Sequence, residues 1–216
     1  MEPKNRFFVR WSPPSRAPAE TVGAGDEVSR VEFEMAAALR NALEMRETTS
    51  QILAHSCRVT EVASAIGELV AVRGAELDWL RTAAQFHEIG MVAVPTDLLT
   101  RSSRLTPAEL DRVRRHAEIG AEIIRPSHGR ATARLIERQY DDYVGLRRNT
   151  RDARELLLAG ILRVADVFDA MTAPRPYQQP VPEERWRQVL RSGSGSKFHP
   201  AAVYALLHIV RPPSSS

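Results

Sequence analysis

Apolar residues recur at intervals of three and four along most of this chain, which is the spacing of amphipathic helices. The first stripe runs from Val28 to Leu43. Two further stripes, over residues 59–70 and 77–87, lie on two more predicted helices; His55 lies on the first of these, and the second ends at Gly90. Later segments have the same pattern, at residues 131–143, 155–171, 182–190 and 200–210. The alternating pattern of paired strands does not occur, so we predict an all-α protein with one helical bundle.

Capping and turn residues mark further boundaries. Thr106, Pro107 and Glu109 have the spacing of a helix start, in which threonine caps, proline takes the first helical position and glutamate reaches back. We expect this helix to continue with one apolar side over residues 110–120. The glycine- and serine-rich segment 192–198 is predicted to be a flexible joint.

The composition of the two ends divides the chain into three parts. Residues 1–25 are rich in Pro, Ala, Gly and Ser and predict a flexible leader, and residues 211–216 predict a disordered tail. Between them, residues 26–210 form the predicted helical domain. Its first helix, residues 26–48, carries a long apolar stripe with no other evident use, so we expect it to link the domain to a partner or to a second copy in a homodimer.

Charge and cysteine content narrow the functional classes. The formal net charge is +3 and the single cysteine, Cys57, excludes an internal disulfide. No apolar run is long enough to cross a bilayer and the N-terminus has no apolar signal core, so we expect a cytoplasmic protein without a membrane partner. The arginine-rich runs are not interleaved with aromatic residues, which makes nucleic-acid binding an unfavoured interpretation.

Three predicted helices carry residues that could bind a metal ion. His55 and His87 lie on the apolar faces of their helices, Glu88 follows His87, and Asp166 lies in a strongly apolar segment. A buried aspartate needs a metal, an arginine such as Arg163, or several hydrogen-bond donors. Each histidine alone is more typical of a hydrogen-bonded core residue. Together, nitrogen and oxygen donors from three helices favour a site for a divalent transition metal.

Four motifs in this order resemble the HD-GYP subgroup of the HD-domain phosphohydrolases. They are "AHSCRV", "AAQFHEIG", "RLTPAELDRVRRHAEIGAEII" and "ILRVADVFDAMTAPRPY", and the resemblance extends from about Glu34 to Val210. It implies an all-α domain with two or three metal ions that hydrolyses cyclic di-GMP in bacterial signalling. The implied mechanism is attack on phosphorus by a metal-bridging hydroxide.

The resemblance also assigns roles by position. It implies that the metal ligands are His55, His87, Glu88, His116 and Asp166. Arg175 would lie near the phosphates of the ligand, and Gly90 and Gly120 would permit close helix packing.

Several positions depart from the pattern of the subgroup. Glu88 stands where the subgroup has aspartate, and Met91 stands where it has lysine. Gln139 and Tyr140 replace two adjacent histidine ligands, and no Gly-Tyr-Pro follows Gly145. Glutamine is a poor metal ligand, and tyrosine ligates only when it is deprotonated. We therefore expect either one divalent transition metal, iron or manganese, or none.

Two functions follow from this pattern. The first is a degenerate HD-GYP domain in cyclic di-GMP-related signalling, which binds a signalling protein, cyclic di-GMP or another nucleotide without hydrolysis. The alternative is a single-metal phosphohydrolase with Glu88 as the candidate catalytic residue. The retained caps and apolar stripes, beside lost ligand positions, favour the first interpretation.

Overall fold

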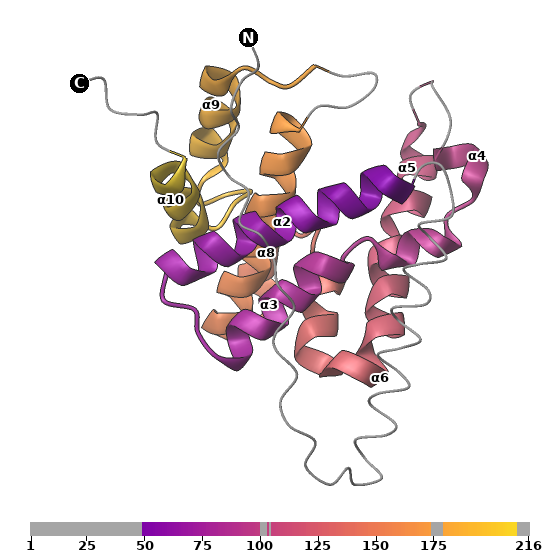
Figure 1. The fold of residues 1–216 in the computed structure, drawn as a ribbon, viewed down its shortest axis with the longest axis horizontal. Coiled ribbons are helices and arrows are strands. Elements are labelled where there is room, and N and C mark those ends of the chain that lie inside the picture. The colour runs from indigo at the N-terminus through magenta and orange to yellow at the C-terminus, as the bar shows by residue number, and fades with distance from the viewer. Residues whose placement is uncertain (1–48, 100–102, 104, 174–178, 211–216) are drawn as a thin grey trace, which may run out of the picture.

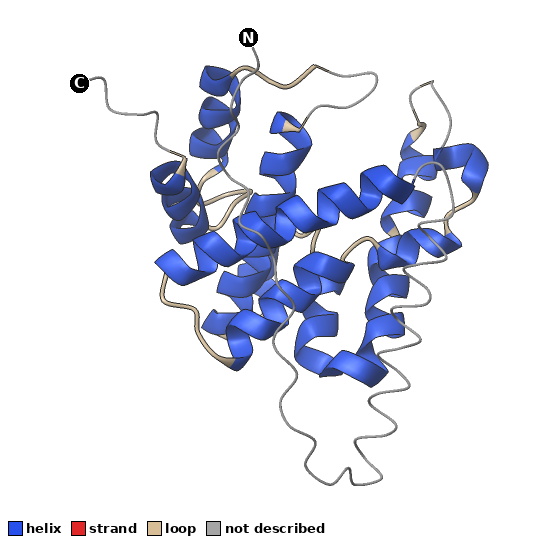
Figure 2. Cartoon of the chain, viewed as in Figure 1, coloured by secondary structure: helices blue, strands red, loops and turns tan. Residues whose placement is uncertain are grey.

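The structure is a computed structural model that describes residues 49–99, 103, 105–173 and 179–210. Within these residues every extended element of secondary structure is a helix (Figure 2). The predicted all-α fold is confirmed for these residues. The predicted leader, the helix over 26–48 and the tail over 211–216 lie outside them. In chain order the elements are α2 (Thr49–Leu69), α3 (Ala75–Phe86), the 3₁₀ helix η1 (Ile89–Ala93), α4 (Thr96–Leu99), α5 (Pro107–Arg114), α6 (His116–Glu137), α7 (Tyr143–Asn149), α8 (Ala153–Thr172), α9 (Glu183–Gly193) and α10 (Pro200–Ile209).

The core forms where α2 crosses α3 and α8 (Figure 1). Val59 and Ile66 of α2, Leu80 of α3, and Ile161 and Leu162 of α8 are all fully buried there. α6 packs against α3 and η1 on one side, and α10 packs against α2 and α8 on the other. No described helix has both the length and the apolar character needed to cross a membrane.

α3 ends earlier than the sequence predicted. Its last residue is Phe86, and His87 takes the C-cap position, so the expected end at Gly90 is wrong. The chain tightens into η1 because this turn packs directly on α6: a Cβ atom on Gly90 would lie 1.9 Å from the backbone oxygen of His116. The glycine therefore permits a contact between two backbones, and this contact fixes where His87 and Glu88 lie.

The start predicted for α5 is confirmed, but its predicted continuation is wrong. Thr106 Oγ1 accepts from the backbone N–H of Glu109 at 3.3 Å, and the Thr106 backbone N–H donates to Glu109 Oε2 at 2.9 Å. The expected single helix through residues 110–120 breaks between α5 and α6. At this break His116 Nδ1 donates to the carbonyl of Val113 at 2.7 Å, and the backbone N–H of Arg115 donates to the same oxygen.

Two later predictions also need correction. The segment 131–143 is not one helix: it forms the end of α6, a turn, and the first residue of α7. α6 itself kinks at Gly129, which has φ 79° and ψ 173°. The predicted flexible joint over 192–198 is an ordered turn, because Tyr143 N–H donates to Lys197 O and Val144 N–H donates to Ser196 O, each at 3.1 Å.

Gly90→Ala tests the contact between η1 and α6. The added methyl meets backbone atoms, which cannot move aside as a side chain can, so we expect the free energy of unfolding to fall by about 2 kcal/mol or more. Chemical denaturation monitored by circular dichroism measures the loss. Gly145→Ala is the matched control: its new Cβ has no neighbour within 4 Å in α7, and we expect no loss. Equal stability of the two variants would contradict the proposed close approach.

Candidate metal centre

Three of the predicted ligands converge in the core. His55 projects from α2, His87 lies at the C-cap of α3, and Asp166 projects from α8. One ligand atom from each lies within 4.8 Å of the other two, which is close enough for all three to hold a single metal ion. His87 is fully buried, and His55 and Asp166 are nearly so.

The orientation of His87 leaves one nitrogen available. Its Nδ1 lies 2.7 Å from the carbonyl oxygen of Ala84, so Nδ1 carries the proton and donates. Its Nε2 therefore has a free lone pair, and this atom lies 3.2 Å from Nε2 of His55. A histidine that donates one nitrogen to a backbone carbonyl and directs the other into a cluster has the arrangement usual for a metal ligand.

His55 is held from behind by a carboxylate and an arginine. Its Nδ1 lies 2.7 Å from Oδ2 of Asp169, which is buried. Arg58 donates to both oxygens of the same carboxylate, from Nε at 2.6 Å and from Nη2 at 3.0 Å. Asp169 thus fixes the ring of His55 with Nε2 directed toward Asp166 Oδ1 at 3.3 Å. Neither Asp169 nor Arg58 is among the site residues predicted from the sequence.

The charges of the cluster shift the protonation of its members. Burial lowers the pKa of His55, but hydrogen bonds to Asp166 and Asp169 and the nearby carboxylates outweigh it and raise the pKa to about 9. Burial would raise the pKa of Asp166, yet the His55 hydrogen bond and the charges of His55 and Arg163 hold it below its usual value. Near neutral pH, without metal, a proton on His55 therefore balances the carboxylates in place of a metal cation.

Glu88 and His116 extend the cluster toward α6. Glu88 Oε1 lies 3.6 Å from His87 Nε2 and 4.0 Å from His55 Nε2, and its Oε2 lies 3.5 Å from His116 Nε2. His116 donates through Nδ1 to Val113, so its Nε2 presents a lone pair. Glu88 Oε2 and His116 Nε2 are both buried, and neither has a hydrogen-bond partner among the described residues. Two such acceptors facing each other are suited to a cation between them.

The two positions predicted to be degenerate adjoin the same side of the cluster. Gln139 is buried and donates through Nε2 to the backbone carbonyl of His87 at 3.0 Å. The ring of Tyr140 packs edge-on against His116, with 5.7 Å between centroids. Burial raises the pKa of the Tyr140 hydroxyl, and the charge of Glu88 raises it further, so the phenol keeps its proton near neutral pH in the metal-free protein.

Of the five predicted metal ligands, the structure gathers His55, His87 and Asp166 in one cluster and places Glu88 between that cluster and His116. Arg175 lies outside the described residues. The positions of Asp169 and Arg58 in the sequence could have indicated that these two residues support the cluster. Asp169 follows Asp166 by one turn, and Arg58 follows His55 by one turn, so two packed helices each present a pair on one face. Their partnership spans 111 residues of sequence and is not visible in any local pattern.

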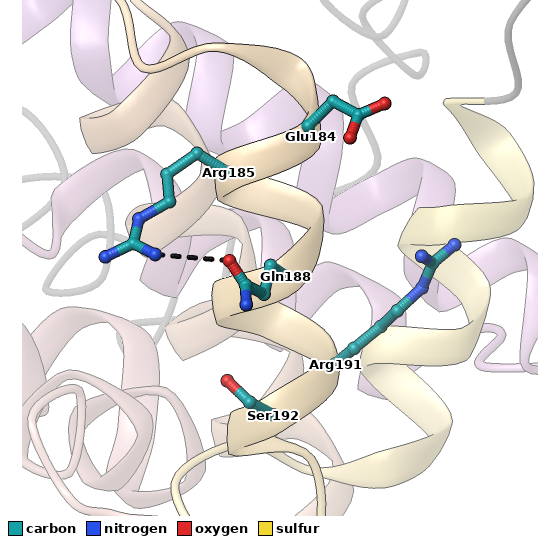
Figure 3. Close-up of a pocket in the computed structure, with 5 residues that line it drawn as sticks. All are labelled: Glu184, Arg185, Gln188, Arg191 and Ser192. Carbon is teal, nitrogen blue, oxygen red and sulfur yellow. Dashed lines mark hydrogen bonds between the residues drawn. The ribbon is translucent and has the colours of Figure 1, made fainter.

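A hollow of about 720 Å³ lies elsewhere, along α9 (Figure 3). Its lining consists of the exposed residues Glu184, Arg185, Gln188, Arg191 and Ser192. Arg185 donates to Gln188 Oε1 at 3.1 Å within the hollow. One exposed helix face without histidines does not assemble a metal or catalytic site, so the cluster on α2, α3 and α8 is the better candidate.

Comparison with known proteins agrees with the motifs. The model of the HD domain family matches residues 37–202. A cyclic di-GMP phosphodiesterase response regulator, RpfG, from Xanthomonas campestris is 31% identical over 84% of this chain and 49% of its own length. A cyclic di-GMP phosphodiesterase from Thermotoga maritima is 31% identical over 72% of this chain and 44% of its own. A 3'3'-cGAMP-specific phosphodiesterase 2 from Vibrio cholerae is 29% identical over 78% of this chain and 33% of its own.

A solved structure agrees on the fold. An HDG"Y"P protein from Bdellovibrio bacteriovorus superposes with a TM-score of 0.58 at 20% identity, covering 86% of this chain and 62% of that one. The predicted relationship to HD-GYP proteins is confirmed by these matches. The chain spans half or less of the length of these three curated relatives.

Metal binding should release a proton from His55. Because its pKa is raised from 6.5 to about 9, the metal-free ring is protonated at pH 7, and it must lose the Nε2 proton to become a ligand. We expect Mn²⁺ affinity to rise about tenfold per pH unit from pH 7 toward 9 and then to level off. Calorimetric titration in buffers of different ionisation enthalpy measures the proton count, and an affinity independent of pH over this range would contradict it.

Asp169→Asn tests the support behind His55. The amide keeps the size of the side chain but loses the charge that orients the ring, so we expect Mn²⁺ affinity to fall by about 10- to 100-fold. Asp142→Asn changes an exposed carboxylate on the surface and serves as the control, with no change expected. If both variants bind Mn²⁺ as the unchanged protein does, Asp169 does not position His55 for a metal.

Proposed function

Because the chain belongs to the HD domain family and is related to cyclic dinucleotide phosphodiesterases, we propose that it holds one divalent transition metal and binds a nucleotide of the cyclic dinucleotide class without hydrolysing it. In this proposal the domain is a regulatory module. Its output passes to a signalling protein rather than through turnover.

One observation carries the proposal: Gln139 and Tyr140 hold the two positions at which the resemblance implies histidine ligands, and neither supplies an imidazole nitrogen. Gln139 donates through Nε2 to the backbone carbonyl of His87, while its Oε1 is buried without a hydrogen-bond partner among the described residues. An amide oxygen is a weaker ligand than imidazole for a transition metal, and the phenol of Tyr140 packs on His116. The resemblance implies histidine ligands at both positions. With them replaced, no further imidazole adjoins His116 and Glu88 among residues 49–99, 105–173 and 179–210, which supports a single-metal site.

The residues that remain fit one metal ion. His55 and His87 would bind through Nε2, because the Nδ1 atoms of both are committed to oxygen acceptors, and Asp166 would bind through a carboxylate oxygen. Two imidazoles and a carboxylate suit iron or manganese. When bound, such an ion supplies positive charge and Lewis acidity toward a phosphate oxygen. The chain itself supplies the orientation, through Asp169 and the carbonyl of Ala84.

Glu88 favours a second candidate function, a single-metal phosphohydrolase. Its Oε2 is buried beside the cluster without a hydrogen-bond partner among the described residues, and such a carboxylate can accept a proton. The described part of the chain holds a second group of three possible ligands nowhere outside this cluster, which makes hydrolysis the less supported of the two functions. Homodimer formation through residues 26–48 remains a proposal from the sequence alone.

Metal content and ligand binding together test the proposed function. We expect about one Mn²⁺ or Fe²⁺ per chain by elemental analysis of protein purified without oxygen or chelators, since one ligand set is complete. Cyclic di-GMP and 3'3'-cGAMP are then tested for binding by calorimetry and for hydrolysis by chromatography. Two or more ions per chain, with turnover of either nucleotide, would contradict the proposal.

The variant Glu88→Ala separates the two functions. In a binding module it should leave nucleotide affinity almost unchanged, whereas in a hydrolase it should abolish turnover. Glu118→Ala, an exposed carboxylate on α6, is the matched control. Gln139→Ala is a poor control, because the loss of its hydrogen bond to the His87 carbonyl would disturb a metal ligand.

A further inference from the structure

Two arginines approach the cluster from the side of Tyr140. Arg163 lies on α8, one turn before Asp166, and its Nη1 is 3.6 Å from Asp166 Oδ2. The Arg163 guanidinium lies 5.7 Å from the centroid of the Tyr140 ring, and the guanidinium of Arg114, at the end of α5, lies 5.8 Å from the same centroid. Since this ring packs on His116, both positive charges flank the half of the site that lacks two histidines.

Arg163 is incompletely satisfied. Its Nε is buried and has no hydrogen-bond partner among the described residues. Its ion pair with Asp166 is longer than a hydrogen bond, and the other oxygen of Asp166 faces His55. A guanidinium carries five donors in a rigid fork, and a buried donor without an acceptor is costly. An anion bound next to it would supply the missing acceptors.

Arg58, the other arginine beside the cluster carboxylates of α8, has acceptors for its donors within the fold, whereas Nε of Arg163 has none in the described part of the chain. Arg58 donates to both oxygens of Asp169 at 2.6 and 3.0 Å, so its charge is matched within the fold. Arg163 faces a carboxylate that the metal centre also needs. Its Nε therefore remains a buried donor that an additional acceptor, such as a ligand oxygen, would satisfy.

Four charged side chains lie close enough to the Tyr140 hydroxyl to affect its pKa. Burial raises the pKa of its hydroxyl, and the carboxylates of Glu88 and Asp166 raise it further. The positive charges of Arg163 and Arg114 act in the opposite direction on the same hydroxyl. Carboxylates and guanidiniums thus adjoin one phenol, on the side of the cluster where Glu88 Oε2 and His116 Nε2 have no partner.

We propose that Arg163, with Arg114 as an outer contributor, binds a phosphate group of the ligand on the Tyr140 side of the cluster and so provides the positive charge that a second metal ion would otherwise provide there. A guanidinium matches phosphate oxygens with two parallel hydrogen bonds. The inference rests on the proposed function, because it places the phosphate beside a single bound metal. It names phosphate esters as the ligand class and Arg163 as the residue that recognises them.

Inorganic phosphate is the probe, titrated calorimetrically into the full chain at saturating Mn²⁺. We expect Arg163→Ala to weaken phosphate binding by about tenfold or more, because a charge-assisted pair of hydrogen bonds is lost. Arg163→Lys should lose less, since it keeps the charge but not the planar fork. Arg114→Ala should lose only about two- to threefold, because its side chain is 54% exposed and screened by solvent. Arg112→Ala, exposed on α5, is the control and should bind as the unchanged protein does.

The affinity for Mn²⁺, measured separately, distinguishes phosphate binding from a purely structural role. If Arg163 only orients Asp166, Arg163→Ala lowers Mn²⁺ affinity but leaves phosphate affinity at saturating Mn²⁺ unchanged, which overturns the inference. If the unchanged protein binds Mn²⁺ but not phosphate, the inference fails and the metal site stands. If it binds no Mn²⁺, the proposed function fails as well. Arg163→Gln replaces the alanine variant if thermal unfolding shows that the latter does not fold.

Discussion

Two carboxylates one turn apart on a buried helix impose the constraint on which the rest of the structure depends. Asp166 and Asp169 lie on α8, where burial of an unpaired charge would cost several kcal/mol. α2 presents His55 and Arg58 to them, also one turn apart. The imidazole of His55 contacts both carboxylates, and the guanidinium of Arg58 binds that of Asp169. Removing one partner of such a buried pair typically costs about 3–5 kcal/mol. The crossing of α2 over α8 is therefore fixed by charge as well as by apolar packing.

The helices were predictable because their signals are local. Apolar spacing located α2, α3, α8, α9 and α10, and the capping residues Thr106 and Glu109 located the start of α5. The errors lie at helix ends. α3 gives way to η1 just before Gly90 meets the backbone of α6, and α5 ends at Arg114, where the side chain of His116 bonds to the carbonyl of Val113. Neither contact leaves a trace in the spacing of apolar residues.

The site shows the same division. Residue type and order identified the candidate ligands, because buried histidines and carboxylates in apolar helices are rare without a purpose. The partners that orient them could not be found in this way. Asp169 meets His55 across 114 residues, and Gln139 meets the carbonyl of His87 across 52. Such pairs depend on how the helices cross, and the crossing depends on the whole core.

The substituted positions illustrate how a site can change its chemistry and keep its fold. Gln139 is as buried as the core around it and holds the end of α3 in place, and Tyr140 fills space against His116. Neither contributes charge, so the carboxylates of the cluster must be balanced from elsewhere. Two arginines supply this positive charge. Arg58 donates two hydrogen bonds to Asp169, whereas Arg163 has a buried Nε without an acceptor among the described residues. A phosphate oxygen would supply the acceptor that this buried donor lacks. Arg58 therefore supports the structure of the site, whereas Arg163 is suited to bind its ligand.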